Sequence, residues 1–242
     1  MKMKLLIFLK GEIKLLKKII KNLLFKLGYK VINLNKEKVD PFLEKNLIYI
    51  HIPKVAGNGI LQSLDMETPG HIHLYEYELL YNLNLDKYYK ISFVRNPWDR
   101  LVSAFFFLRE GGMKEIYPKD EIMQNELNQF KNFSNFLNKL NENEIYRKNI
   151  LKKVHFKPQY SWVMNTSGEV ELDFLGKFEN LETDFNLLKM KFNKKNVELK
   201  SKNKSNHKPY WFYYNKKTAK IVEKIYKKDI QIFQYKFPYD KI

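Results

Sequence analysis

Short runs of apolar residues alternate along the chain with stretches in which apolar positions recur every three or four residues. The runs at 47–52 and 89–94 are almost continuously apolar, and a third run lies near 172–178. Runs of this length, rich in β-branched and aromatic residues, predict buried strands. Helical patterns begin at about 58, after Asn96 and at Asn180, and also span 121–142 and 215–234. Strands that alternate with helices predict an α/β fold with a central, mainly parallel sheet flanked by helices.

The first 40 residues follow a different pattern. Between 12 and 27 an apolar stripe with lysines between its members predicts a basic amphipathic helix. The stripe consists of Ile13, Leu16, Ile20, Leu23 and Leu27. The apolar run from Leu5 to Leu9 ends at Lys10 and is too short for a membrane span or a secretion signal. We therefore divide the chain into an N-terminal helix with its linker, 1–40, and a main domain, 41–242.

Two roles are open for this amphipathic helix. It packs against the main domain or against a second copy of the chain, giving a homo-oligomer. Alternatively, its lysines bring residues 1–30 to an anionic membrane surface. We expect a cytoplasmic protein, with peripheral attachment to the inner face of the membrane in the second case.

The composition fits one basic globular protein. The 242 residues are 44% hydrophobic, enough for one sizeable core, and include no Cys, which excludes disulfides. A formal net charge of +17 indicates an anionic partner such as an acidic polysaccharide, a membrane surface or nucleic acid. We expect no specific nucleic acid. With neither an HExxH motif nor a carboxylate cluster, we predict no metal site.

A strand–loop–helix segment, HIPKVAGNGI at 51–60, has the features of an anion-binding turn. Gly57 and Gly59 allow backbone N–H groups to turn toward an oxyanion, and Lys54 stands at the end of the strand. In a Walker A loop the Lys follows the glycines, whereas here it precedes them. The segment is therefore not an ordinary ATP or GTP loop.

A second segment of this kind, FVRNPWDRLVSAFF, follows about forty residues later. Arg95 ends the strand, Asn96 and Pro97 start a helix, and Ser103 lies about two turns further on. Ligands of open α/β sheets bind at the carboxyl ends of the strands. The two segments together predict a site for a nucleotide with two separate phosphate-type groups. The alternative is that each is a common turn with a solvated cation.

His71 and His73 flank Ile72, so an extended chain points both rings to one face. Imidazole suits a general base because its pKa lies near neutrality. The alternative interpretations are a surface loop or an adventitious metal site.

These motifs resemble those of the carbohydrate sulfotransferases that use 3′-phosphoadenosine-5′-phosphosulfate. HIPKVAGNGI is similar to their 5′-phosphosulfate-binding loop, and FVRNPWDRLVSAFF to their 3′-phosphate-binding motif. The likeness is strongest to uronosyl (heparan sulfate) 2-O-sulfotransferases and their bacterial relatives. GHIHLYEYEL, GKFENLETDF and the C-terminal region extend it over roughly residues 45–237. The resemblance implies a P-loop-like three-layer fold, with 41–242 as the sulfotransferase domain.

The resemblance also implies roles for individual residues. His73 is the first choice for the general base, with His71 assisting, and Lys54 stabilises the leaving oxygen. Arg95 and Ser103 hold the 3′-phosphate, and His155 and Gln159 match a pair near the acceptor. The 5′ side of the nucleotide is held by Lys54, Val55, Ala56, Gly57, Asn58 and Gly59. Hydroxyl residues are usual in the family where this chain has Val55, Asn58 and Gly59, so backbone N–H groups and Lys54 carry the phosphate contacts here.

The implied reaction is in-line transfer of a sulfuryl group to a sugar hydroxyl, without a metal. The expected acceptor is a bacterial surface polysaccharide, a lipopolysaccharide or a glycolipid, in an acidic or lipid-linked form among others. Tyr160, Trp162 and Trp211 either stack on a sugar ring or belong to the core. Two other classes stay open: a P-loop-type nucleotide kinase, and a non-enzymatic basic module that binds anions or membranes.

Overall fold

The computed structural model describes residues 5–8, 30–33, 42–43, 45–81, 83–194, 196–199 and 208–242. The amphipathic helix predicted at 12–27 lies outside these residues. Within the first 40 residues the structure describes two short strands, β1 (Leu5–Phe8) and β2 (Lys30–Asn33), which pair in parallel. The apolar run at Leu5 is therefore a strand.

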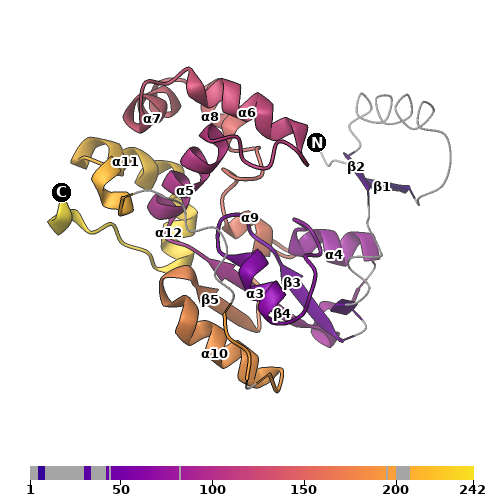
Figure 1. Ribbon diagram of the computed structural model, residues 1–242. Helices are drawn as coiled ribbons and strands as arrows, with labels where there is room; N and C mark the ends of the chain where they lie inside the picture. The colour runs from indigo at the N-terminus through magenta and orange to yellow at the C-terminus, as the bar shows by residue number, and fades with distance from the viewer. Residues whose placement is uncertain are drawn as a thin grey trace.

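The central sheet has three parallel strands in the order β3-β4-β5 (Figure 1). They are β3 (Leu47–Ile50), β4 (Tyr89–Val94) and β5 (Phe174–Lys177). All of β3 and all but the first residue of β4 are buried, which explains why both runs are mostly apolar, with Lys90 and Ser92 as the polar residues of β4. In β5, a Cβ at Gly176 would lie 2.2 Å from the Phe93 ring, so only glycine allows the two strands to pack here. The predicted α/β class with a parallel sheet is confirmed.

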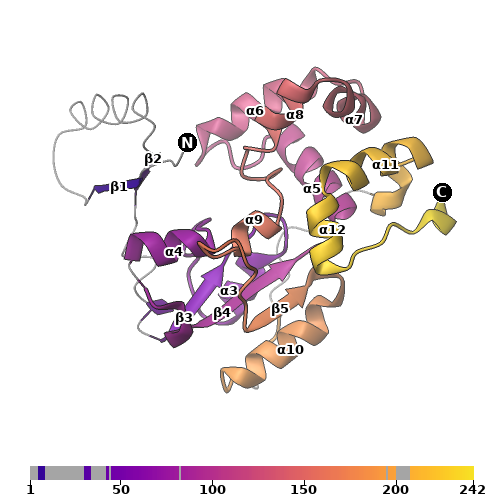
Figure 2. The same cartoon turned by 180° about the vertical axis from the view of Figure 1, so that it is seen from behind.

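Helices cover both faces of this sheet. In Figure 1, α3 lies in front of β3 and β4, whereas in Figure 2 α9 lies on the opposite face. The backbone N–H of Tyr75, in α4, donates to the carbonyl of Met164, which follows α9, so α4 packs beside α9. The bounds are α3 (Gly57–Ser63), α4 (Leu74–Tyr81), α9 (Tyr160–Val163) and α10 (Leu181–Lys191), the last of which follows β5.

The remaining helices gather beyond the carboxyl ends of the strands, around α5 (Figures 1 and 2). They are α5 (Pro97–Arg109), α6 (Pro118–Asn128), α7 (Phe133–Glu142), α8 (Glu144–Ile150), α11 (Lys216–Ile225) and α12 (Lys227–Phe233). Short 3₁₀ turns complete the order: η1 (Leu85–Lys87), η2 (Phe178–Asn180), η3 (Tyr210–Tyr213) and η4 (Tyr239–Lys241). An aromatic core joins α5 to α7, where the ring of Phe105 lies 5.1 Å from that of Phe133.

Two predicted helices are each divided in two. The stretch 121–142 breaks before Phe133, because the Asn132 side chain accepts a hydrogen bond from Asn135 N and starts α7 anew. The stretch 215–234 breaks at Tyr226, whose hydroxyl donates to the carbonyl of Phe156, 2.7 Å away. A tertiary contact therefore accompanies the second break, which no local pattern signals.

Candidate active site

The loop between β3 and α3 takes its shape from left-handed residues and one required glycine. Lys54 and Ala56 have φ angles of 71° and 66°. A Cβ on Gly57 would lie 2.3 Å from Cδ2 of His51, so any side chain at Gly57 would displace the His51 ring. Val55 is buried in the core. The loop therefore offers a ligand its backbone and Lys54, but not the Val55 side chain.

The Lys54 ammonium lies 3.7 Å from the centroid of the Phe107 ring. Burial, followed by the nearby charge of Arg95, lowers the pKa of Lys54 to about 8. No carboxylate among the described residues forms an ion pair with it. A bound anion would supply the missing counter-charge and strengthen the charged form.

Three hydrogen bonds fix the orientation of the Arg95 guanidinium at the end of β4. Its Nε and Nη2 donate to the two carboxylate oxygens of Asp99 over 2.8 and 2.9 Å, and its Nη1 donates to the Lys54 carbonyl over 3.2 Å. The guanidinium also lies 3.9 Å from the Phe178 ring centroid. Because a guanidinium has five N–H groups, Arg95 keeps two for a ligand. The bond to Lys54 joins the two predicted anion-binding segments.

Gln159 fixes the backbone of Arg95. Its Oε1 accepts from Arg95 N over 2.9 Å, and its Nε2 donates to Arg95 O over 2.7 Å. The Gln159 side chain is fully buried. The predicted role of Gln159 near the acceptor gains no support from this geometry, because both ends of the carboxamide already bind Arg95.

Asp229 in turn holds the segment that carries Gln159. Its carboxylate accepts from the backbone N–H groups of Gln159 and Tyr160, each over 2.8 Å. Burial raises the pKa of Asp229 to about 6, although these hydrogen bonds oppose the shift. Sequence reasoning missed Asp229 because 70 residues separate it from Gln159.

One face of α5 borders the Lys54 loop. Arg100, Ser103 and Phe107 are three and four residues apart and share this face. Arg100 is buried, and it donates from Nε to Pro53 O and from Nη1 to Lys157 O, each over 3.0 Å. Its Nη2 has no partner among the described residues. Ser103 is buried on this face, one turn before Phe107, whose ring contacts the Lys54 ammonium.

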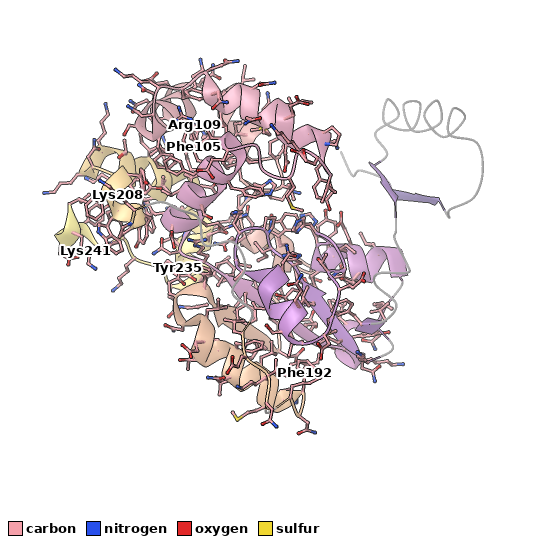
Figure 3. The ribbon with its side chains drawn as sticks, in the orientation of Figure 1. Phe105, Arg109, Phe192, Lys208, Tyr235 and Lys241 are labelled. Atoms are coloured by element: carbon pink, nitrogen blue, oxygen red, sulfur yellow. The ribbon has the colours of Figure 1, made fainter. Side chains whose placement is uncertain are left out.

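The peptide after Arg95 is anchored by Glu179, in the turn that follows β5. Asn96 N donates to one carboxylate oxygen of Glu179, and the hydroxyl of Tyr235 donates to the other over 2.9 Å. Tyr235 lies on the C-terminal segment, between the sheet and the helical layer around α5 (Figure 3). The GKFENLETDF motif thus has a structural role in positioning the start of α5.

His71 presents a free lone pair. Its Nδ1 lies 2.7 Å from the His51 carbonyl, and because a carbonyl only accepts, Nδ1 carries the proton. Nε2 is then the basic atom, and no described residue binds it. Although the residue as a whole is exposed, desolvation by the surrounding protein, with the charges of Arg100 and His73 adding to the effect, lowers the pKa of the ring. The His71 imidazole is therefore mainly neutral at pH 7.

His73 is buried and occupied at both ring nitrogens. Its Nδ1 lies 3.0 Å from a Glu76 carboxylate oxygen, and its Nε2 lies 3.1 Å from the Lys157 ammonium. The ring stacks on Trp162, with centroids 4.1 Å apart and planes 9° apart. Trp162 is itself buried, which favours the core interpretation over sugar stacking for this residue. Sequence reasoning missed Glu76 and Lys157 as partners of His73.

His155 belongs to the group around Lys54. Burial, followed by the charges of Lys54, His71 and Arg100, lowers its pKa to about 3. His155 is therefore neutral at physiological pH. The centroid of its ring lies 5.4 Å from that of Phe107, and the Phe107 ring also contacts the Lys54 ammonium.

The described residues contain no group of His, Cys, Asp or Glu arranged to hold a metal ion. Among the helices in the described part of the chain, none is long and apolar enough to span a bilayer.

The carboxyl edge of the parallel sheet brings Lys54 and Arg95 together, with the unprotonated His155 near Lys54, and this is the edge at which open α/β sheets bind their ligands. A family model described as the sulfotransferase family matches residues 42–236, and the chain belongs to this family. No curated protein and no solved structure matches the chain. The predicted membership of a sulfotransferase family is thus confirmed, and it favours sulfuryl transfer over the kinase and the binding module.

Proposed function

We propose that this sulfotransferase transfers the sulfuryl group from 3′-phosphoadenosine-5′-phosphosulfate to a hydroxyl of a carbohydrate. The observation that carries the proposal is the hydrogen bond from Arg95 Nη1 to Lys54 O, which joins the two anion-binding segments. A donor with phosphate groups at two positions of its ribose would meet both segments at once. The donor supplies the activated sulfuryl group, and residues of the chain bind the donor and stabilise the charge that develops.

Lys54 and the loop backbone would bind the 5′-phosphosulfate end of the donor. The Lys54 ammonium would offset the negative charge that grows on the leaving phosphate. Arg95 has two N–H groups left after its bonds to Asp99 and Lys54, and with Ser103 it would bind the 3′-phosphate. The chemistry needs no metal, since these cations supply the electrostatic stabilisation.

For the general base, the geometry favours His71 over His73, the first choice from the sequence. His71 keeps Nε2 free with Nδ1 protonated, so it can accept a proton from an acceptor hydroxyl at once. His73 would first have to release Lys157 from its Nε2. In this assignment His73, stacked on Trp162 and bound to Glu76, keeps Lys157 in place.

The acceptor is proposed to be a bacterial surface polysaccharide, a lipopolysaccharide or a glycolipid. Lipid-linked acceptors would place the reaction in the cytoplasm at the inner face of the membrane, with residues 1–30 at the lipid surface. Sedimentation of the full chain with anionic vesicles, and not with zwitterionic ones, is the expected result. Equal sedimentation with both, or with neither, would remove this part of the proposal.

Calorimetric titration tests donor binding. The protein should bind 3′,5′-bisphosphoadenosine without Mg²⁺ and in preference to ATP with Mg²⁺. Arg95→Ala should weaken this binding, while the control Arg109→Ala, near the far end of α5 (Figure 3), should not. A folded protein that prefers ATP with Mg²⁺, or that binds neither nucleotide, would refute the proposal.

The base assignment is tested by turnover of the donor with a panel of oligosaccharides. His71→Ala should bind the bisphosphate like the wild type and lose turnover, whereas His73→Gln should keep a measurable part of it. If His73→Gln abolishes turnover and His71→Ala does not, the base is His73.

A further inference from the structure

A cavity of about 290 Å³ lies between α3 and the segment that follows it. Its lining residues are Asn58, Leu61, Gln62, Met66, Glu67 and Thr68. Small-molecule sites in proteins begin at about this volume. The cavity is large enough for one sugar unit of a longer acceptor.

Thr68, in the lining of the cavity, binds His51 and so links the cavity indirectly to His71, the proposed base. The Thr68 hydroxyl lies 2.8 Å from His51 Nδ1 and accepts from Gly70 N over 3.2 Å. The His51 ring lies 4.6 Å from the ring of His71. Asn58, on the other wall, belongs to the loop segment predicted to bind the donor. One wall of the cavity thus bonds to His51, whose buried ring lies against the ring of the proposed base His71, and the opposite wall belongs to the donor loop.

The lining has the chemistry of a site for an uncharged sugar. Two carboxamides, one hydroxyl and one carboxylate face the cavity together with the apolar side chains of Leu61 and Met66. Amide and carboxylate oxygens accept from sugar hydroxyls, amide N–H groups donate to them, and apolar side chains pack against C–H groups.

The charges of the lining are unusual for so basic a protein. The chain has a net charge of +17, yet the only charged residue in the lining is Glu67. Close by, Lys194 is already paired with Asp65 over 3.2 Å. A sugar carboxylate in this cavity would face Glu67 without a compensating cation.

We propose that this cavity is the acceptor subsite and that it takes an uncharged sugar unit, discriminating against a uronate. The proposal rests on the proposed function, and it names the class of acceptor. It reverses the expectation of an acidic acceptor that the net charge and the likeness to uronosyl enzymes suggested, because the excess positive charge is not in the cavity lining.

The test uses two probes that differ only at C6, p-nitrophenyl β-glucoside and p-nitrophenyl β-glucuronide. Each is titrated into the full protein labelled at the methionine methyl groups and saturated with 3′,5′-bisphosphoadenosine. NMR then follows the Met66 signal, assigned with Met66→Leu. The glucoside should shift this signal and bind at least about tenfold more tightly than the glucuronide. Glu67→Gln should reduce that ratio, while the control Glu182→Gln, on α10, should leave it unchanged.

Three results would overturn the proposal. One is equal or tighter binding of the glucuronide, and another is a Met66 signal that neither probe shifts. The third is a Met66 shift caused by the bisphosphate alone, which would make the cavity part of the nucleotide site. Saturation with the bisphosphate is measured in the same samples, so a failure of donor binding is seen separately from a failure of this inference.

Discussion

Replacing Gln159 by Met tests whether this buried side chain positions Arg95 for nucleotide binding. Met has nearly the volume of Gln, so the substitution preserves packing and removes the two hydrogen bonds to the Arg95 backbone. Because Gln159 is fully buried, water cannot replace those bonds. The Arg95 N–H and carbonyl would then lack partners at the carboxyl end of β4.

The size of the effect follows from these two groups. Leaving one buried donor or acceptor unsatisfied costs about 1–3 kcal/mol, so we expect the free energy of unfolding to fall by about 2–6 kcal/mol. For a protein of this length that loss lowers the melting temperature by about 4–24 °C. Movement of the Arg95 backbone should also weaken binding of 3′,5′-bisphosphoadenosine by about tenfold or more.

Urea unfolding and calorimetric titration, both well below the melting temperature of the variant, measure the two effects separately. The control is Gln231→Met, at an exposed position of α12, with an expected change within about 0.5 kcal/mol. A Gln159→Met protein with the stability and nucleotide affinity of the wild type would refute the role of Gln159 in positioning Arg95. Lower stability with unchanged affinity would leave it a purely structural residue.

Three further substitutions or titrations test the site. Gly57→Ala would place a Cβ 2.3 Å from the His51 ring and push that ring toward His71. Turnover should therefore fall by about tenfold or more, and a variant that turns over as fast as the wild type would contradict this packing argument. Because burial lowers the pKa of Lys54 to about 8, the affinity for the bisphosphate should fall as pH rises through that value. Lys54→Arg should make this affinity independent of pH in the same range. A wild-type affinity that does not change with pH would contradict the role of Lys54. Burial raises the pKa of Asp229 from 3.8 to about 6, so the folded protein binds this proton more tightly than the unfolded chain. The free energy of unfolding should therefore decrease as pH rises between those values. If the free energy of unfolding of Asp229→Asn falls with pH at the same slope, Asp229 is not the group responsible.

The sequence by itself determined the features that depend on local chain order. Apolar runs that end at Lys54 and Arg95 predicted buried parallel strands with cations at their carboxyl ends, and the structure confirms the parallel sheet. The motif order further predicted the family, which the match over 42–236 confirms. His155, a predicted site residue, lies near enough to Lys54 that the charge of Lys54 lowers the pKa of His155, and Ser103 lies on the face of α5 that also carries Phe107.

Only the tertiary structure decided how the two histidines of the motif differ. In the sequence His71 and His73 are equivalent, because alternate residues of an extended segment share one face. In the fold, one ring meets a backbone carbonyl and the other meets Glu76 and Lys157, so only His71 keeps a free basic nitrogen. Likewise Gln159 matched a substrate residue by its motif, but Arg95 lies 64 residues earlier and takes both ends of its carboxamide. Which atom of a polar side chain remains free depends on partners that are distant in sequence, and folding alone brings those partners within hydrogen-bond distance.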